Sequence, residues 1–311
     1  MRIAIVAPGG VGGYFGGLLA KAGEDVVALA RGAHLAAIQQ NGLRIEGPRI
    51  DATVPMRASN DAAELGVADI VLFAVKLYQI DDAARAAAPL IGPRTLAISL
   101  LNGITGPETI ARVLPDATVL GGVAWVSAVI AAPGHIRATS GMSSIEFAAP
   151  DGNEARALAA DFAARCQHAG FGAEMTDNIA SALWNKLIGL ASNASLTSAS
   201  RLPAGPLYTD PDVVDVARAL VGEATAVARA QGVELPAGIE DTWVGRFKGF
   251  PAGMYASMYH DVAKGGPLEV DGLSGYIVRE GKRLGVPTPH HAALYAVLKP
   301  HRNGLPAVGN A

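Results

Sequence analysis

IAIVAPGGVGGYFGG, residues 3–17, is the stretch of sequence that decides the fold. A short β-branched run that ends in a glycine cluster and continues into an apolar helical pattern is typical of a strand–turn–helix phosphate cradle. Glycine lets the backbone approach a pyrophosphate, and the N–H groups that open the following helix point at its charge. The fingerprint Gly-x-Gly-x-x-Gly is matched at its second and third glycines, but its first position is Ala7. An ordinary glycine-rich turn is the alternative to a nucleotide cradle formed by Gly9, Gly10, Val11 and Gly12.

Length and composition narrow the class of protein. A chain of 311 residues is long enough for about two domains, and with half of its residues hydrophobic and 17% charged it has ample core. A net charge of −3 and a pI near 6.2 argue against nucleic acid or an anionic membrane as partner. The single Cys166 excludes an intramolecular disulfide, and we expect it to be buried as a small hydrophobe. The N-terminal apolar run stops at Pro8, too early for a signal peptide, and residues 123–132 are too few to span a membrane. We therefore expect a soluble, cytoplasmic protein.

The first half of the chain alternates between strand-like and helix-like segments. Continuous apolar strands separated by helices predict a parallel sheet with helices on both faces. The strands are expected at 2–7, 25–30, 70–75, 95–99 and 118–121, and the helices at 12–22, 33–40, 79–88 and 107–114. Residues 41–57 predict a small antiparallel excursion, and three shorter strands are expected at 123–130, 135–139 and 143–148.

The second half has a different character. Helical patterns separated by proline and glycine are expected at 178–193, 213–231, 238–249, 254–264, 271–284 and 290–299. The sequence therefore predicts an α/β domain over residues 1–175 and an all-α domain over residues 176–311.

Arg31 stands where the second strand ends, nineteen residues after Gly12. In sheets of this type an acidic residue at that place accepts a hydrogen bond from the ribose 2′-hydroxyl of NAD. An arginine there favours a 2′-phosphate and hence NADP. The alternative is a solvated loop arginine.

Two further polar side chains follow strands of the predicted sheet. Lys76 follows strand 70–75, and Asn102 follows the next strand, both at the carboxyl edge where ligands bind. Lys76 could reach a phosphate or the nicotinamide. Asn102 is followed by glycine, so a plain turn is its alternative role.

Lys186 lies beside an apolar helical stripe formed by Ile179, Leu183, Leu187 and Leu190. Its ammonium either extends to water or ends in a cleft, where burial lowers the pKa and makes the lysine a usable proton donor. Downstream, Glu269 precedes a predicted helix, so a role at that helix N-terminus is the structural alternative for it or for Asp271.

In sequence order these segments resemble the ketopantoate reductase family, the 2-dehydropantoate 2-reductases. The resemblance extends from Met1 to about Leu298. It is carried by the glycine loop together with RGAHL at 31–35, VK at 75–76, LNG at 101–103, LWNKL at 183–187, SM at 257–258 and EVD at 269–271. It implies a Rossmann-type domain that binds NADPH, a helical domain that closes over a 2-oxo acid, and a step in pantothenate biosynthesis.

The resemblance also implies roles for individual residues. Lys186 is the general acid toward the carbonyl oxygen of the substrate, and Asn102 helps to hold that lysine and the substrate. Ser257 and Glu269 bind or organise the carboxylate and hydroxyl end of the substrate. Arg31 and Lys76 match cofactor-binding positions.

Three positions depart from the family pattern. The family places asparagines four and eight residues after the lysine, where this chain has Leu190 and Ala194, with Asn193 displaced by one. Met254 stands where an asparagine is common. Because apolar side chains replace hydrogen-bonding ones at the substrate-binding positions, we expect a more hydrophobic substrate than ketopantoate, such as a branched or aromatic 2-oxo acid.

Other functions remain as alternatives. One is a non-catalytic NADP-sensing module, and another is a reductase or dehydrogenase that acts on an imine or a 3-hydroxy acid. The seven histidines lack the spacing of metal ligands, so no metal is expected. The expected partner is the small-molecule substrate, and a homodimer is left open.

Overall fold

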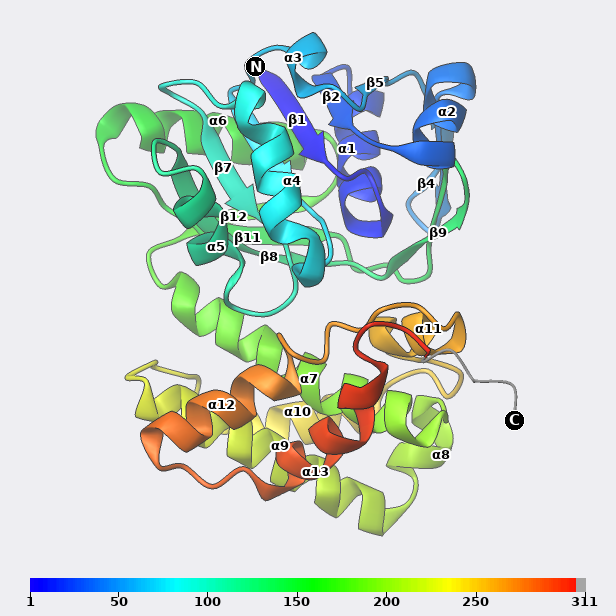
Figure 1. Cartoon of the computed structure of the whole chain (residues 1–311), viewed down its shortest axis with the longest axis vertical. Coiled ribbons are helices and arrows are strands. Elements are labelled where there is room, and N and C mark those ends of the chain that lie inside the picture. The colour runs from blue at the N-terminus through cyan, green and yellow to red at the C-terminus, as the bar shows by residue number, and fades with distance from the viewer. Residues whose placement is uncertain (306–311) are drawn as a thin grey trace. The chain divides into compact units, whose positions relative to one another are not determined.

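The computed structural model describes residues 1–305, and the chain divides into two compact units, Met1–Ile179 and Ala180–Ala311. The N-terminal unit is an α/β domain and the C-terminal unit is helical (Figure 1). The sequence places the boundary at 175/176.

An eight-stranded sheet forms the centre of the N-terminal unit, in the order β12-β11-β8-β7-β6-β1-β2-β5. Every neighbouring pair is parallel except β8 and β11, which are antiparallel. The strands are β1 (Arg2–Val6), β2 (Asp25–Leu29), β5 (Arg57–Ser59), β6 (Ile70–Phe73), β7 (Leu96–Ser99), β8 (Thr118–Trp125), β11 (Ser144–Ala148) and β12 (Gly172–Thr176). The mostly parallel sheet confirms the predicted fold class.

Helices cover both faces of this sheet because its strands are apolar on both sides. In β1, Ile3 and Ile5 belong to one buried cluster, whereas Ala4 and Val6 belong to the other. The first cluster includes side chains of α1 (Gly10–Lys21), α2 (Gly32–Asn41) and α6 (Asn153–His168), and Cys166 is fully buried in it. The second includes side chains of α3 (Ala62–Leu65), α4 (Ile80–Ala87) and α5 (Gly106–Val113). Short 3₁₀ turns flank α4 at Leu77–Gln79 and Ala88–Leu90.

A second sheet of four strands, in the order β4-β3-β10-β9, packs on α1. Its strands are β3 (Leu43–Gly47), β4 (Ile50–Val54), β9 (Ala128–Ala132) and β10 (His135–Ala138). β3 and β4 form an antiparallel pair, which confirms the excursion expected at 41–57. The excursion is extended by the β9–β10 hairpin, through the parallel pairing of β10 with β3.

Two segments differ from the prediction. The strands expected at 118–121 and 123–130 are replaced by a continuous β8 that ends at Trp125, followed by β9 from Ala128. Gly122 does not interrupt β8, because it supports close packing: a Cβ there would lie 3.0 Å from Leu100 Cδ2. Residues 172–176, where the sequence analysis expects no strand, form the edge strand β12 with Ala173 buried and Glu174 exposed.

Ala7, the residue at the first position of the glycine fingerprint, has a left-handed backbone with φ of 65°. Its N–H donates to the Leu29 carbonyl at 3.0 Å, and its own carbonyl accepts from the Gly9 N–H at 2.7 Å. The turn therefore demands at this position the conformation that glycine adopts freely, and alanine adopts it at a cost.

We expect Ala7→Gly to stabilise the protein. Removing the strain of a left-handed alanine stabilises the folded state by more than the greater conformational entropy of glycine stabilises the unfolded state. The free energy of unfolding should therefore rise by about 0.5–1 kcal/mol. Urea denaturation measures the change. A lower free energy of unfolding in Ala7→Gly would contradict the strain at Ala7.

The C-terminal unit is helical, as expected. Its helices are α7 (Ile179–Ser200), α8 (Ala204–Tyr208), α9 (Pro211–Ala230), α10 (Ile239–Lys248), α11 (Ser257–Ala263), α12 (Ser274–Leu284) and α13 (Pro289–Leu298). A 3₁₀ turn follows at Lys299–His301. α9 packs against α8, α10, α12 and α13. Glu223 on α9 caps α13 by accepting from the N–H groups of His290 and His291, each at 2.9 Å.

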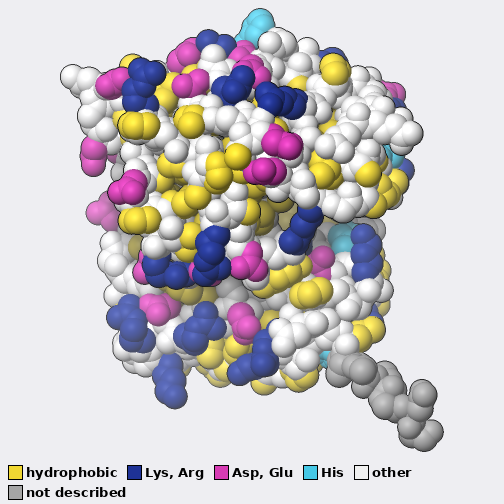
Figure 2. All heavy atoms as spheres, turned by 45° about the horizontal axis from the view of Figure 1, so that its top comes forward, with side chains coloured by type: hydrophobic (Ala, Val, Ile, Leu, Met, Phe, Trp, Pro, Cys, Tyr) yellow, Lys and Arg dark blue, Asp and Glu magenta, His cyan; other side chains and the backbone are white. Residues whose placement is uncertain are grey.

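Charged side chains of both signs lie on the face of the molecule that Figure 2 shows. On the face shown in Figure 2, basic and acidic side chains are interspersed, in line with the net charge of −3. Every helix within residues 1–305 is too short or too polar to span a lipid bilayer.

Candidate active site

The residues that the sequence suggests for cofactor binding lie at one edge of the eight-stranded sheet. β7, β6, β1 and β2 are adjacent, and their carboxyl ends are in register: Val6 is paired with Leu29 and Phe73, and Phe73 with Ser99. The segments that leave these ends carry the glycine turn, Arg31, Lys76 and Asn102. All four were expected at this edge from the sequence, and the register of the strands places them there.

The glycine turn is shaped for close approach. α1 begins at Gly10. The first N–H groups of a helix have no partner within the helix, and Gly9 at the N-cap has no side chain to accept from them. A Cβ at Gly12 would lie 2.6 Å from the Ala7 carbonyl oxygen and 3.0 Å from Ala74 Cβ, so only glycine lets α1 pack this closely on the strand ends. A Cβ at Gly9 would meet only Ile130 Cδ1, at 3.8 Å. Uncapped N–H groups beside an open stretch of backbone fit a pyrophosphate.

β9 also contacts this turn, which the sequence did not suggest. A Cβ at Gly10 would overlap the backbone carbonyl of Ala128. Gly10 is therefore required by the strand that crosses the start of α1. No local signal reveals this contact, because 118 residues separate the two positions in the chain.

Three more cofactor-side candidates have distinct settings. Arg31 is exposed at the N-cap of α2, and its guanidinium forms no ion pair within the described residues 1–305. Lys76 is half-buried and precedes the 3₁₀ turn Leu77–Gln79. Asn102 is half-buried in a bend followed by Gly103, whose φ is +84°. An exposed guanidinium at the end of β2 fits an anionic group on the ribose.

On the C-terminal unit, Lys186 is half-buried on α7, on the helix that buries Leu183 and Leu187. Burial lowers the pKa of its ammonium to about 8, and the Glu269 carboxylate opposes that shift electrostatically. A lysine with this pKa is protonated at neutral pH and can give up its proton.

Glu269 is 3% exposed, between the buried Leu268 and Val270. α12 begins at Ser274, five residues after Glu269, and the side chain of its N-cap residue Leu273 makes no capping hydrogen bond. Asp271 instead accepts a hydrogen bond from the Tyr295 hydroxyl at 2.5 Å, which ties the turn after Glu269 to α13. A buried carboxylate needs a partner of opposite charge, and Lys186 supplies that charge.

Trp243 supports the same stretch of α7 from α10. Its indole N–H donates to Asn185 Oδ1 at 3.0 Å, and its ring lies where a Cβ on Gly189 would be. These contacts fix the residues on either side of Lys186. Sequence reasoning missed Trp243, since nothing in its local pattern points to a helix more than fifty residues earlier.

The residues that the sequence suggests for substrate binding differ in their exposure and in their contacts. Leu190 and Met254 are half-buried, and Ser257 is exposed at the start of α11. Asn193 is 5% exposed, and its Oδ1 accepts from the Tyr208 hydroxyl at 2.7 Å. The amide oxygen of Asn193 therefore takes part in the packing of α7 against α8.

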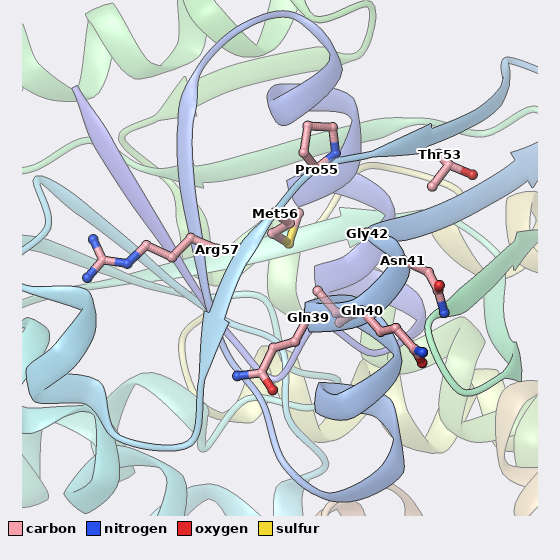
Figure 3. Close-up of a pocket in the computed structure, with 9 residues that line it drawn as sticks. Gln39, Gln40, Asn41, Gly42, Thr53, Pro55, Met56 and Arg57 are labelled. Carbon is pink, nitrogen blue, oxygen red and sulfur yellow. The ribbon is translucent and has the colours of Figure 1, made fainter.

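A separate pocket of about 550 Å³ lies at the end of α2, between Gln39, Met56 and Arg57 (Figure 3). It contains none of the candidate residues. Within residues 1–305, no three His, Cys, Asp or Glu side chains are grouped so that they could hold a metal ion.

Comparison with known proteins matches both units. Residues 3–152 match the family model "Ketopantoate reductase PanE/ApbA", and residues 178–302 match the model of its C-terminal domain. A 2-dehydropantoate 2-reductase of Mesorhizobium japonicum is 30% identical, with 96% of this chain and 97% of the relative covered.

Solved structures share the fold. A PanE/ApbA family ketopantoate reductase from Ralstonia eutropha is 35% identical, with a TM-score of 0.89 over 97% of this chain and 98% of that one. D-mandelate dehydrogenase, solved with NADH and anilino(oxo)acetate, has a TM-score of 0.88 over 97% and 98% of the two chains. At 23% identity, that second likeness shows the fold alone.

Proposed function

The chain belongs to the ketopantoate reductase family, and on that premise we propose that it catalyses the NADPH-dependent reduction of a 2-oxo acid to the 2-hydroxy acid. In this proposal residues 1–175 bind the cofactor and residues 176–311 supply the proton donor. The observation that carries it is Lys186 on α7, whose pKa burial lowers to about 8 against the electrostatic effect of the buried Glu269 carboxylate. A reductase of carbonyl groups needs such a donor, because charge develops on the oxygen as the carbon is reduced.

The proposed roles follow from this chemistry. Bound NADPH supplies the hydride to C2 of the substrate. Lys186 Nζ donates its proton to the C2 oxygen, which becomes the hydroxyl, and water reprotonates the amine. Glu269 keeps Lys186 charged, Ser257 binds the substrate, and Asn102 helps to orient the carbonyl. Arg31 and Lys76 bind the phosphates of the cofactor, with the turn at Gly9–Gly12.

The exposed Arg31 supports NADPH as the cofactor rather than NADH. In Arg31→Ala we expect the KM for NADPH to rise about tenfold, the value of a charge-assisted hydrogen bond, and the KM for NADH to change by less than about twofold. Initial rates with each cofactor measure both. Equal changes for the two cofactors, or a wild-type preference for NADH, would contradict a role for Arg31 at a 2′-phosphate.

The pKa of Lys186 predicts a pH dependence. Because only the protonated lysine can donate, kcat/KM should fall about tenfold per pH unit as the pH rises above 8. Glu269 stabilises the ammonium, so Glu269→Gln should lower the pKa further and move this limb to lower pH. Profiles of kcat/KM from pH 6 to about 10 measure the limb. If Glu269→Gln left the pH at which kcat/KM begins to fall unchanged, the electrostatic effect of Glu269 on Lys186 would be contradicted.

The half-buried Leu190 and Met254 favour a substrate more hydrophobic than ketopantoate. The test is a panel of 2-oxo acids, including ketopantoate and branched and aromatic members, assayed with NADPH and with NADH. Turnover of ketopantoate far above that of the hydrophobic acids would overturn the substrate preference. It would leave the reductase assignment intact and place the reaction in pantothenate biosynthesis.

Two alternatives are separated by the same assay. Turnover of imines or 3-hydroxy acids in place of 2-oxo acids would change the substrate class, and binding of NADPH without any turnover would indicate a sensing module. We further propose a cytoplasmic location and a homodimer. Light scattering measures the oligomeric state.

A further inference from the structure

His34 lies at a junction of three segments of the N-terminal unit. The half-buried imidazole, on α2, has Nε2 2.8 Å from the Pro8 carbonyl oxygen and Nδ1 2.9 Å from the Gly134 backbone nitrogen. Pro8 belongs to the glycine turn, and Gly134 is the turn of the β9–β10 hairpin. One side chain therefore joins the glycine turn, α2 and the hairpin.

The two partners assign the donor and acceptor roles of the two ring nitrogens of His34. A backbone N–H can only donate, so Nδ1 accepts from Gly134. A carbonyl can only accept, so Nε2 carries the proton and donates it to Pro8. A single neutral tautomer satisfies both bonds.

The partners of His34 are themselves held firmly. A Cβ at Gly134 would lie 2.8 Å from Ala37 Cβ on α2, and the Gly134 carbonyl accepts from the Arg44 N–H at 2.8 Å. The hairpin turn is thus docked on both α2 and β3, and it gives His34 a fixed support.

The bond to Pro8 acts where the turn is formed. The Pro8 carbonyl lies against α1, since a Cβ at Gly13 would come within 2.7 Å of its oxygen. Because the peptide unit is planar, holding the Pro8 oxygen also holds the Gly9 N–H in the bond that closes the turn, 2.7 Å from the Ala7 carbonyl oxygen. The turn closed by that bond contains Ala7, whose left-handed backbone is strained, so the bond from His34 supports a turn that is costly to form.

We propose that His34 is a positioning residue for the dinucleotide: by donating to the Pro8 carbonyl from a support fixed by Gly134, it holds the glycine turn in the shape that receives the pyrophosphate. The proposal rests on the proposed function, because it assumes that this turn binds the cofactor. Its effect is on cofactor affinity, and the chemical step is left to other residues.

Two substitutions separate the two bonds of His34. The amide of His34→Gln reaches as far as Nε2 and can still donate to Pro8, whereas the shorter His34→Asn retains only a group near Nδ1 that can accept from Gly134. Titration calorimetry of the full-length protein with NADPH and with NADH gives the dissociation constants. His168→Gln, an exposed histidine on α6, is the matched control.

We expect His34→Asn to weaken binding of the preferred dinucleotide about fivefold or more, the usual value of one hydrogen bond, and His34→Gln to bind within about twofold of wild type. At saturating cofactor, kcat should stay within about twofold in both, and His168→Gln should match wild type in every measurement. Asparagine binding as tightly as wild type, glutamine binding as weakly as asparagine, or a fall in kcat without weaker binding would each overturn the proposal. If the wild type bound neither dinucleotide, the proposed function would be wrong, and the role proposed for His34 would be wrong with it.

Discussion

Replacing Lys186 by alanine is expected to lower kcat by about 10²–10⁴-fold with every accepted substrate, the usual contribution of a positioned general acid. Dinucleotide affinity should stay within about twofold, because Lys186 lies on α7 and the glycine turn lies in the other unit. The alanine also removes the positive charge that offsets the buried Glu269, so some loss of stability is expected as well. Stopped-flow rates at saturating NADPH and 2-oxo acid, together with the melting temperature, measure both effects.

Two further variants separate proton donation from charge. Lys186→Arg keeps the positive charge beside Glu269, but a guanidinium holds its proton too tightly to donate it, so kcat should remain low while stability recovers. Lys282→Ala removes an exposed lysine on α12 and should leave kcat unchanged. If NADPH consumption in Lys186→Ala equalled that of the wild type, the assignment of the proton donor would be wrong.

The second large effect is expected at Gly10. Gly10→Ala places a methyl group on the backbone carbonyl of Ala128, which cannot move as a side chain can, so either α1 or β9 must shift. We expect the free energy of unfolding to fall by about 1–3 kcal/mol, as for other overpacked sites. Because Gly10 opens α1 beside the proposed pyrophosphate site, NADPH binding should weaken in the same variant.

Gly9→Ala is the matched control for that prediction. A Cβ at Gly9 meets only Ile130 Cδ1 at 3.8 Å, an ordinary contact, so stability should be nearly unchanged. The methyl group would nevertheless stand on the side of the backbone that is open to a ligand, so the Kd for NADPH should rise by about tenfold. Urea denaturation and calorimetry together distinguish the two glycines. Equal stability of the two variants would show that β9 does not require Gly10.

Much of the N-terminal unit was predictable because its signals are local. Strands such as Ile70–Phe73 are continuously apolar, and the carboxyl ends of parallel strands meet at one edge wherever they fall in the sequence. That rule predicts that Arg31, Lys76 and Asn102 lie at one edge of the sheet. For Lys186, the apolar stripe beside it is compatible with an ammonium that extends to water or with one that ends in a cleft. The resemblance to the family favours the second, in which the lysine is a proton donor.

Long-range packing accounts for what the sequence did not reveal. Ala7 has a left-handed backbone because the turn requires it, and no residue type signals that requirement. Gly122 reads as a strand break but packs tightly inside β8. Asn193 reads as a polar group near the substrate, yet its amide oxygen bonds to Tyr208 on another helix. In each case the deciding partner comes from elsewhere in the fold.

Hydride transfer from NADPH to a 2-oxo acid can be followed directly with a labelled cofactor. NADPH deuterated at the transferred position of the nicotinamide is incubated with the protein and the panel of 2-oxo acids, and the products are analysed by mass spectrometry. We predict a 2-hydroxy acid with one deuterium at C2, formed in equal amount to NADP⁺ and lost in Lys186→Ala. NADPH that binds to the wild type while no 2-oxo acid acquires deuterium would contradict it.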